Sequence, residues 1–365
     1  MLFTSTVAVS AIFNEPFMQW FKEQGWEVHY ACRDDLRETH ANKHFCISFN
    51  RSPQSVDNFR AYGQLKNIIA AEKYDIIHCH TPMAGVITRL AARNARQLGT
   101  KVLYTAHGFH FYKGAPLQNW LLYYPVEKFL SKYTDCLVVM NEEDYVVAKS
   151  FKAGKVEKID GVGVSLTKFA PVSLEEKSKL RNIHGYSDND LILLYTAEFI
   201  PRKNHRFMLE TFKELTSKIP SIKLLLAGKG SILEDMKHLS KHLGIENSVV
   251  FLGFCKNIPD MCRIADIQVS SSFQEGLPIN ILEGMATGLP VVCSKIRGHV
   301  DLLSNGAGIL FDIRDKTAFI SAIEQLHQNP IKRKELSSIG MQDTKKFSLE
   351  NALKRMAGIY TCYMQ

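Results

Sequence analysis

Short apolar segments alternate with longer amphipathic segments along this chain. Short apolar runs between breaker residues indicate buried strands, and apolar positions that repeat every three or four residues indicate helices. In the first half, the pattern predicts helices near residues 15–24, 83–97 and 118–131, and strands at residues 2–9, 26–32, 75–79, 101–105 and 136–140. Because a helix between two strands makes a crossover connection, this alternation predicts a parallel sheet covered on both faces.

The same pattern begins again after about residue 185 and predicts strands at residues 191–196, 223–227, 249–252 and 266–270. A length of 365 residues is long for one core. We therefore predict an α/β protein with two doubly wound, Rossmann-like domains and a ligand cleft between them. The expected parts are a first domain at residues 1–167, a polar linker at 168–190, a second domain at 191–345 and a C-terminal helix at 346–365 that crosses back to the first domain.

Composition and charge narrow the class of protein only in part. The apolar fraction of 45% and the charged fraction of 22% are those of an ordinary globular protein. The net charge of +8 fits an anionic substrate, an anionic membrane surface or nucleic acid equally well. The eight cysteines lack Cys-x-x-Cys spacing, so we expect buried free thiols in a reducing cytoplasm. No apolar run reaches the ~18 residues that span a bilayer, and we expect a soluble or peripheral protein.

His78, Cys79 and His80 carry the side chains of a metal site. On a strand, however, alternate residues point to opposite faces, so Cys79 does not join its two neighbours easily. We therefore predict no structural metal, and interpret the two histidines as structural or substrate-facing.

Two glutamates eight positions apart, Glu275 and Glu283, flank a predicted helix start. Pro278 favours the first turn of a helix that begins just after Glu275. The amides around Gly276 and Leu277 would then lie at the helix N-terminus, where they attract an anion such as phosphate. Carboxylates beside a phosphate site make sense if they accept hydrogen bonds from the hydroxyl groups of a sugar and a ribose. The alternative is an ordinary solvated first turn, where glutamate is favoured by the helix dipole.

Four further candidate residues follow the carboxyl ends of predicted strands. Arg202 and Lys203 could neutralise a leaving diphosphate, or could be solvated loop cations. His107 could donate to a sugar hydroxyl or to a phosphate, or could be structural. Gly228 would allow a ligand to approach the backbone closely. The chain has no dinucleotide-binding fingerprint and no P-loop, which argues against a dehydrogenase and a kinase.

The run FQEGLPINILEGMATGLPVV, with Glu275, Gly276, Asn280 and Glu283 in place, resembles the E-x7-E motif of retaining glycosyltransferases. The resemblance is to the glycogen-synthase-like group, glycosyltransferase family 4, and within it to enzymes of capsule and exopolysaccharide synthesis. It extends over almost the whole chain and implies the GT-B fold. Lys203 also matches the family's lysine at its position.

The resemblance implies a role for each matched residue. Glu275 would bind the hydroxyls of the donor sugar, Glu283 the ribose, and Lys203 the leaving charge. His107 would contact the transferred sugar from the first domain. Phe254 lies where the family holds the nucleotide base. Gly276, Leu277 and Asn280 would belong to the nucleotide-sugar site.

One departure from the family concerns the cations. Six residues before the lysine the family usually has Gly-Arg, whereas this chain has Ala197 and Glu198. Either Arg202 replaces the missing arginine, or the donor phosphates are held with one cation fewer. The capsule and exopolysaccharide subgroup shares the glutamate variant, so Glu198 stays in the candidate site.

The activity implied by the resemblance is retaining transfer of a sugar from a nucleotide diphosphate, most simply a UDP-hexose or UDP-N-acetylhexosamine. The acceptor would be a saccharide linked to a polyprenyl diphosphate in capsule, exopolysaccharide or O-antigen assembly. We expect no cofactor and no divalent metal, because cations and helix amides are available to the diphosphate. Two alternatives are a GT-B nucleotide-sugar epimerase and a catalytically silent partner of another transferase.

Membrane contact is a further hypothesis. Arg89, Arg93 and Arg96 fall on one face of the helix predicted at residues 83–97, and residues 109–124 are rich in aromatic side chains. A basic stripe near exposed aromatics would suit the anionic inner face of the cell membrane or a polyprenyl diphosphate. The alternative is a solvated basic face and a set of core aromatics. We expect no nucleic-acid partner.

Overall fold

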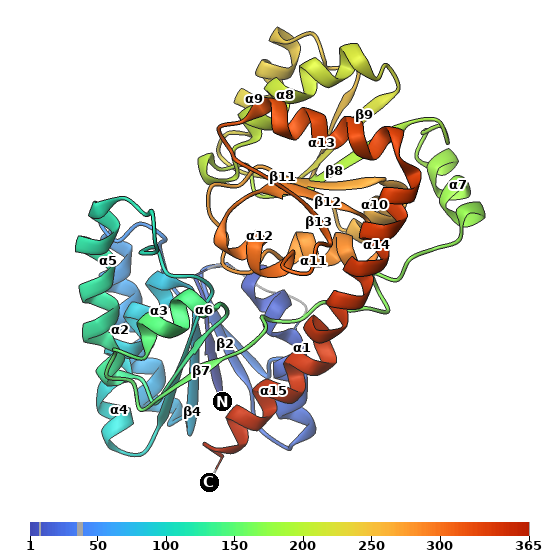
Figure 1. The fold of residues 1–365 in the computed structure, drawn as a ribbon. Helices are drawn as coiled ribbons and strands as arrows, with labels where there is room; N and C mark the ends of the chain where they lie inside the picture. The colour runs from blue at the N-terminus through green and yellow to red at the C-terminus, as the bar shows by residue number, and fades with distance from the viewer. Residues whose placement is uncertain (7–8, 35–38, 365) are drawn as a thin grey trace. The chain divides into compact units, whose positions relative to one another are not determined.

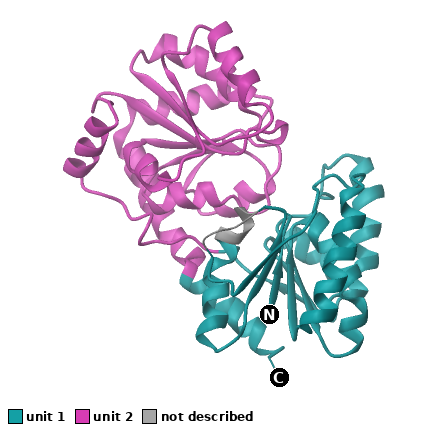
Figure 2. Ribbon diagram, turned by 180° about the vertical axis from the view of Figure 1, so that it is seen from behind, with its two compact units in different colours: residues 1–162, 350–365 teal, residues 163–349 magenta. Residues whose placement is uncertain are grey.

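The computed structural model describes residues 1–6, 9–34 and 39–364, and the chain divides into two compact units (Figure 2). Unit 1 comprises Met1–Val162 and Glu350–Gln365, and unit 2 comprises Gly163–Leu349. Unit 1 is thus assembled from two separate stretches of the chain, whereas unit 2 is continuous.

Unit 1 contains a seven-stranded sheet in the order β3-β2-β1-β4-β5-β6-β7, with every strand pair parallel. The order runs outward from β1 and β4, which is the doubly wound pattern. Its strands are β1 (Leu2–Thr4), β2 (His29–Cys32), β3 (Lys43–Cys46), β4 (Ile76–His80), β5 (Lys101–Ala106), β6 (Cys136–Val139) and β7 (Lys155–Lys158). Its helices are α1 (Val9–Glu23), α2 (Asp57–Glu72), α3 (Pro82–Ala91), α4 (Arg93–Gln97), α5 (Leu117–Leu130), η1 (Ser131–Tyr133), α6 (Glu142–Ala148) and α15 (Leu349–Thr361).

The sheet of unit 1 is covered on both faces, with α2, α3 and α5 on one side and α1 and α15 on the other (Figure 1). This explains why β4 is buried at every position. The last helix is part of this core. The fully buried Tyr360 of α15 lies 4.7 Å from the ring of Phe21, and its hydroxyl bonds to Nδ1 of His78 at 2.7 Å.

Unit 2 contains a six-stranded parallel sheet in the order β10-β9-β8-β11-β12-β13. Its strands are β8 (Leu191–Thr196), β9 (Ile222–Ala227), β10 (Val249–Gly253), β11 (Ile267–Ser270), β12 (Val291–Ser294) and β13 (Gly308–Phe311). Its helices are α7 (Leu174–Ile183), η2 (Pro201–Lys203), α8 (His205–Lys218), α9 (Leu233–His242), α10 (Ile258–Ile264), α11 (Ile279–Ala286), α12 (Arg297–Leu302), α13 (Lys316–Gln328), α14 (Pro330–Thr344) and η3 (Lys345–Phe347).

Alternate residues of β8 belong to two separate cores of unit 2. Leu193 packs with α8 and α13 on one face of the sheet, and Leu194 packs with α10 and α11 on the other. The predicted α/β class with two doubly wound sheets is confirmed. All eight cysteines are described and none forms a disulfide; five of them are buried, while Cys46 and Cys362 are exposed.

Several predicted boundaries are wrong. The strand predicted at residues 2–9 ends at Thr4, and residues 7–8 of it lie outside the described residues. The first helix begins at Val9 instead of near residue 15. The helix predicted at residues 83–97 is divided at Ala92 into α3 and α4.

The polar segment at residues 168–190 contains a helix, α7. Ser173 caps it by accepting a hydrogen bond from the amide of Glu176 at 3.1 Å. The buried Arg181 of α7 donates to the Ile264 carbonyl at 2.8 Å and to the carboxylate of Asp266 at 2.6 Å. These bonds fix the segment to unit 2.

The predicted basic stripe does not form. Arg89 is fully buried, where its guanidinium pairs with Glu127 at 2.9 Å and lies 4.1 Å from the ring centroid of Tyr104. Arg96 makes two hydrogen bonds to Asp135, at 3.0 and 2.8 Å. Both arginines therefore hold unit 1 together instead of forming a cationic surface.

Glu127→Ala should destabilise unit 1, because it leaves the charge of Arg89 buried without its carboxylate. We expect the free energy of unfolding to fall by about 3 kcal/mol or more. All three tryptophans, at 20, 26 and 120, lie in unit 1, so urea unfolding followed by tryptophan fluorescence reports on this unit. The control Glu142→Ala removes the partner of Lys158 in an exposed pair of unit 1 and should change stability by less than about 1 kcal/mol. An unchanged unfolding midpoint for Glu127→Ala would contradict the role of the pair.

Candidate functional site

The strand order of unit 2 reverses between β8 and β11, and ligands of doubly wound sheets commonly bind beyond the carboxyl ends at such a point. η2 follows β8 and carries Lys203, while the loop after β11 carries Glu275. Because the two strands are parallel neighbours, both residues reach the same edge of the sheet. The ammonium nitrogen of Lys203 lies 2.5 Å from Oε1 of Glu275.

Hydrogen bonds tie the two loops together beneath this pair. The Lys203 carbonyl accepts from the hydroxyls of Tyr195 at 2.6 Å and Ser271 at 3.3 Å. The amide of Phe273 donates to the Arg202 carbonyl at 2.9 Å. Lys203 is therefore held in place by hydrogen bonds to the main chain of its own loop, as well as by the ion pair of its side chain with Glu275.

Glu275 is an ionised carboxylate in a nearly closed position, with 7% of its surface exposed. Burial raises its pKa, but the charge and hydrogen bond of Lys203, together with Ser272, bring that pKa below the ordinary carboxyl value. An ionised buried carboxylate with a fixed orientation is well suited to accept hydrogen bonds from hydroxyl groups.

Glu283 lies one turn inside α11, and its pKa is shifted in the opposite direction from that of Glu275. Burial raises its pKa to about 7, opposed only partly by the charge of Lys168. Among the described residues, its carboxylate has no hydrogen-bond partner, and its surface is only partly exposed. The Glu283 carboxylate is thus partly shielded from water, and no group in the part of the chain that the structure describes donates hydrogen bonds in place of that water. A ligand with hydrogen-bond donors, such as hydroxyl groups, would fit here.

The start of α11 differs from the prediction. The helix begins at Ile279, and Pro278 is its N-cap residue, with φ −79° and ψ 102°, instead of its first helical residue. The amides of Ile281 and Leu282 bond to the Pro278 carbonyl, so the amides of Ile279 and Asn280 are those at the open N-terminus. Gly276 and Leu277 lie in the preceding loop.

Two glycines allow close backbone packing around the site. A Cβ at Gly298, near the start of α12, would lie 2.6 Å from the Gly276 carbonyl oxygen. A Cβ at Gly228, after β9, would lie 1.9 Å from the Ala197 carbonyl oxygen. Gly228 is therefore required by the packing of its own loop against the loop after β8.

The other predicted residues lie along the same edge of unit 2. Arg202 and Glu198 are exposed in the loop after β8, and Asn280 is partly exposed on α11. Phe254 follows β10 and is 53% exposed, with the Lys229 ammonium 5.8 Å from its ring centroid. The structure brings Lys203 and Glu275 into contact, and distributes the remaining candidates over neighbouring loops.

Sequence reasoning missed His299, which is fully buried at the start of α12. Its Nδ1 donates to the Ser294 carbonyl at 2.7 Å, and burial lowers its pKa to about 4 despite the nearby charge of Glu275. A histidine directly after a glycine beyond the end of β12 was the available signal. Its neutral imidazole therefore fixes the start of α12 to the end of β12.

In unit 1, His107 follows β5 and is exposed, with Nε2 3.1 Å from Nδ1 of His80. His80 and His78 are buried, with ring centroids 4.1 Å apart and ring planes tilted by 41°. Burial, with the neighbouring His107, lowers the pKa of His78 to about 3, so its ring is neutral and bonds to Thr105 at 2.7 Å. A row of three histidines thus runs from the core to the carboxyl edge of this sheet.

Among the described residues, no group of three His, Cys, Asp or Glu side chains is placed to hold a metal ion. Asp188 and Asp190 are spaced as Asp-x-Asp, but they precede β8 and so lie at the amino edge of the sheet. Their carboxylates accept hydrogen bonds from Ser178 and from the amide of Ser187, both at 2.7 Å. Both aspartates therefore shape the turn before β8.

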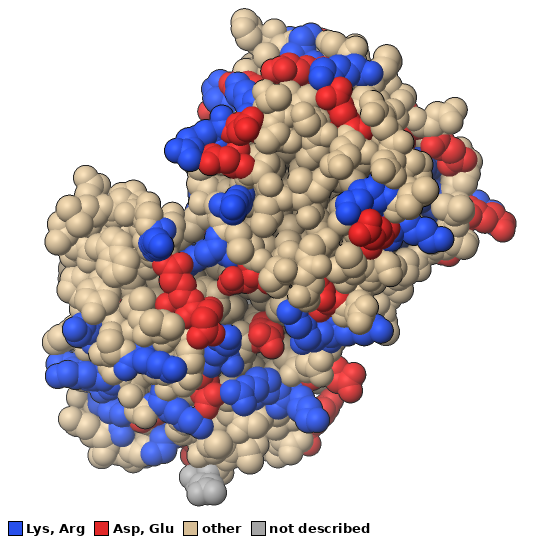
Figure 3. Space-filling model, viewed as in Figure 1, with Lys and Arg blue, Asp and Glu red and all other residues tan. Residues whose placement is uncertain are grey.

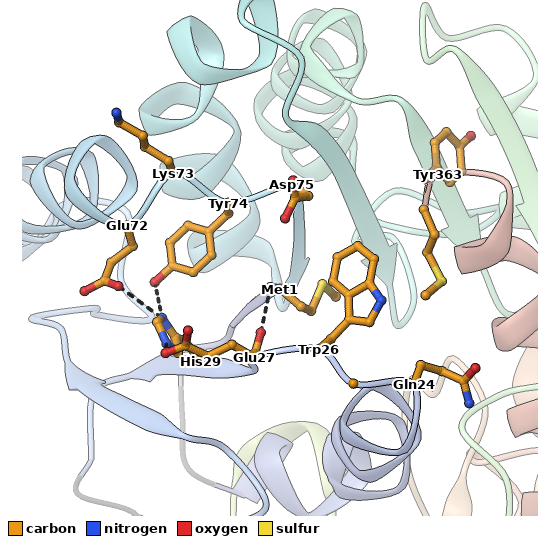
Figure 4. A pocket seen from close by; sticks show the side chains of 12 residues that line it. Met1, Gln24, Trp26, Glu27, His29, Glu72, Lys73, Tyr74, Asp75 and Tyr363 are labelled. Atoms are coloured by element: carbon orange, nitrogen blue, oxygen red, sulfur yellow. Dashed lines mark hydrogen bonds and ion pairs between the residues drawn. The ribbon is translucent and has the colours of Figure 1, made fainter.

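A pocket of about 480 Å³ lies at the amino edge of unit 1 (Figure 4). His29 bonds there to the Tyr74 hydroxyl at 2.7 Å and to Glu27 at 2.8 Å, and the Met1 amine donates to the Glu27 carbonyl at 2.9 Å. These residues precede the strands, at the opposite edge from His107. Their polar groups bond to one another across the base of the sheet.

Two doubly wound parallel sheets, one in each unit, are the architecture of the GT-B fold. The chain matches the family of glycosyl transferases group 1 at residues 176–343 and the glycosyl transferase 4-like family at residues 4–141. It is 45% identical, over its whole length, to the putative glycosyltransferase EpsD of Bacillus subtilis (strain 168), and covers 97% of that protein. The chain therefore belongs to the group 1 glycosyltransferases, which confirms the predicted family.

Two further relatives are informative. The chain is 27% identical over 84% of its length to the UDP-Gal:alpha-D-GlcNAc-diphosphoundecaprenol alpha-1,3-galactosyltransferase of Escherichia coli, of which it covers 81%. The crystal structure of Anabaena Alr3699/HepE in complex with UDP and glucose superposes with a TM-score of 0.82 at 18% identity, over 99% of each chain. This second likeness establishes the fold.

The raised pKa of Glu283 predicts a pH-dependent stability. Between its ordinary pKa of 4.5 and about 7, the folded protein retains a proton that the unfolded chain releases. The wild type should therefore lose stability as the pH rises through this window, by at most about 3 kcal/mol. Glu283→Gln should remove this loss, and should be more stable than the wild type at pH 8 but not at pH 4.5.

Thermal unfolding followed by circular dichroism at both pH values measures the difference. The control Glu175→Gln, at an exposed site on α7, should change the unfolding temperature by the same small amount at each pH. A stability difference for Glu283→Gln that does not vary with pH would show that this carboxyl is ionised throughout.

Proposed function

We propose that this protein is a retaining glycosyltransferase that moves a hexose or N-acetylhexosamine from UDP to a saccharide acceptor linked to a polyprenyl diphosphate. The acceptor would belong to an exopolysaccharide, capsule or O-antigen under assembly. The contact between Lys203 and the buried Glu275, beside the open N-terminus of α11, is the observation that carries the proposal. The UDP-bound Anabaena structure supports the donor class, and the Escherichia coli relative supports a diphosphate-linked acceptor.

The chemistry requires that negative charge on the departing diphosphate be stabilised. In the proposed reaction the bond between the anomeric carbon and the UDP oxygen breaks. The oxygen of the acceptor hydroxyl forms its bond to that carbon on the same face of the sugar, and the hydroxyl proton passes to the departing diphosphate oxygen. Lys203 and the amides of Ile279 and Asn280 face the leaving phosphates, and Arg202 adds a second cation. These groups would fulfil the task without a divalent metal.

The carboxylates would orient the donor. Glu275, held ionised by Lys203, accepts hydrogen bonds from the hydroxyls of the sugar, and Glu283 accepts them from the ribose. The exposed ring of Phe254 offers a surface on which a base can stack, and Gly228, Gly276 and Leu277 line the backbone approach. Glu198 stands where the family's arginine is absent. His107 would contact the sugar from unit 1.

We further propose that the protein acts in the cytoplasm, at the inner face of the cell membrane. Among the residues that the structure describes, no helix is long and apolar enough to cross a membrane. An acceptor with a polyprenyl chain nevertheless requires the enzyme to work at a bilayer surface.

Lys203→Ala should lower kcat about a hundredfold, because about 3 kcal/mol of leaving-group stabilisation is lost in the transition state. The measurement is transfer of labelled sugar from the UDP-sugar to a lipid-linked acceptor. Arg206→Ala is the matched control, since it removes an exposed cation from the first turn of α8 and should leave kcat within about twofold. A normal kcat for Lys203→Ala would exclude Lys203 from the reaction.

The donor can be identified from thermal shifts with UDP, GDP, ADP and dTDP sugars, with and without magnesium. A donor at one hundred times its Kd should stabilise the protein by about 2.7 kcal/mol. We expect a selective shift with one UDP-sugar that does not depend on magnesium, and a weaker shift for Glu283→Ala. In transfer assays, the same variant should raise KM for the donor more than it lowers kcat.

Incubation with the UDP-sugar also distinguishes a glycosyltransferase from the two alternatives, a nucleotide-sugar epimerase and a catalytically silent partner of another transferase. An epimerase would convert the bound UDP-sugar to its isomer without an acceptor. The absence of any nucleotide shift would favour a catalytically silent partner, and would make the two glutamates ordinary residues of a helix start.

A further inference from the structure

Helix α5 of unit 1 is apolar around most of its circumference. Its sequence, LQNWLLYYPVEKFL, contains one acidic and one basic residue. Helices of this composition are ordinarily enclosed by protein or lie in a membrane. In this structure only Glu127 and Leu130 of α5 are buried.

The two sides of α5 have different surroundings. On the inner side, Trp120, Tyr123 and Tyr124 pack against the core of unit 1, and Glu127 pairs with the buried Arg89. The outer side, which we call the α5 outer face, is made of side chains that are 42–72% exposed: Leu117, Leu121, Leu122, Val126 and Phe129. These positions recur at helical spacing, so they form one continuous stripe.

Three exposed lysines lie along the α5 outer face, and the carboxylate of Glu143 accepts a hydrogen bond from the amide of the first of them, Lys113. Lys113, Lys128 and Lys132 are exposed before, within and after the helix. The Lys132 ammonium lies 3.8 Å from the ring centroid of Phe129 and 4.8 Å from that of Tyr133, and Lys128 lies 5.5 Å from that of Tyr124. The one acid of α5, Glu127, is turned inward. In Figure 3 the part of unit 1 over α5 is mostly tan, with basic groups below it and acidic groups to its right.

We propose that the α5 outer face binds the surface of an anionic lipid bilayer. The leucines and Phe129 would enter the boundary between headgroups and acyl chains, and the long lysine side chains would keep their ammonium groups among the phosphates. Protein interfaces are depleted in lysine, and a stripe of exposed leucines with three exposed lysines along it therefore fits a lipid surface better than a protein partner. This surface is independent of the donor and acceptor proposed above, so vesicle binding would stand if glycosyl transfer were disproved.

Co-sedimentation with vesicles tests the proposal on the full chain. The wild type should bind vesicles of phosphatidylcholine containing one third phosphatidylglycerol, and should bind pure phosphatidylcholine at least about tenfold more weakly. Leu121→Asp with Phe129→Asp should lower partitioning to the anionic vesicles at least about tenfold. Both side chains are exposed, so the fold should persist, and circular dichroism checks this. Lys128→Gln with Lys132→Gln should also weaken binding on the order of tenfold, an effect that high salt reduces.

The matched control is Ile183→Asp with Ile331→Asp, the same change at two exposed apolar residues of unit 2, at 76% and 82% exposure. It should partition like the wild type. Equal partitioning of the wild type onto neutral and anionic vesicles would overturn the proposal, as would normal binding by the Leu121→Asp, Phe129→Asp variant. If the wild type is instead a dimer by light scattering and this variant is a monomer, the α5 outer face is an interface between copies and the proposal is wrong.

Discussion

The ion pair between Lys203 and Glu275 is the constraint around which unit 2 is organised. A carboxylate as buried as that of Glu275 is costly unless a cation and hydrogen bonds compensate for its lost hydration. The parallel neighbours β8 and β11 end side by side, so the lysine after one strand is delivered to the glutamate after the other. The serines of the β11 loop and the close packing at Gly298 then hold that loop at the position the pair requires.

In both units, an aspartate at the amino edge of the sheet joins two neighbouring strands. At the amino edge of unit 1, Asp135 accepts from the amide of Val102 at 2.8 Å and from Arg96 of a surface helix. At the amino edge of unit 2, Asp266 accepts from the amide of Ile192 at 2.8 Å and from Arg181. Each aspartate precedes one strand and fastens the beginning of its neighbour. Polar groups at the amino edges thus serve the framework, which leaves the carboxyl edges to carry the residues with candidate chemistry.

The fold was largely predictable because apolar strands and intervening helices have strong periodicity, and both sheets follow from it. The positions of Lys203, Glu275 and His107 at strand ends were predictable for the same reason. The burial of Arg89 was not, because its partner Glu127 is distant in sequence and helical spacing alone does not distinguish a buried arginine from a solvated one. The break at Ala92, the helix in the polar segment at 174–183 and the structural role of His299 likewise depend on tertiary hydrogen bonds. The local pattern carries little sign of them.

The division of unit 1 between the two ends of the chain has a consequence for synthesis on the ribosome. The sheet of unit 1 is complete by Lys158, but the helix that covers Phe21 and His78 is made last. While residues 163–349 are synthesised, at roughly 5–20 residues per second, one face of unit 1 is covered by α1 without α15 for on the order of ten seconds or more. Unit 2, being continuous, can complete its own core first. The nascent chain thus resembles a folded second half attached to an open first half, and chaperones that bind exposed aromatic surface would have their longest opportunity there.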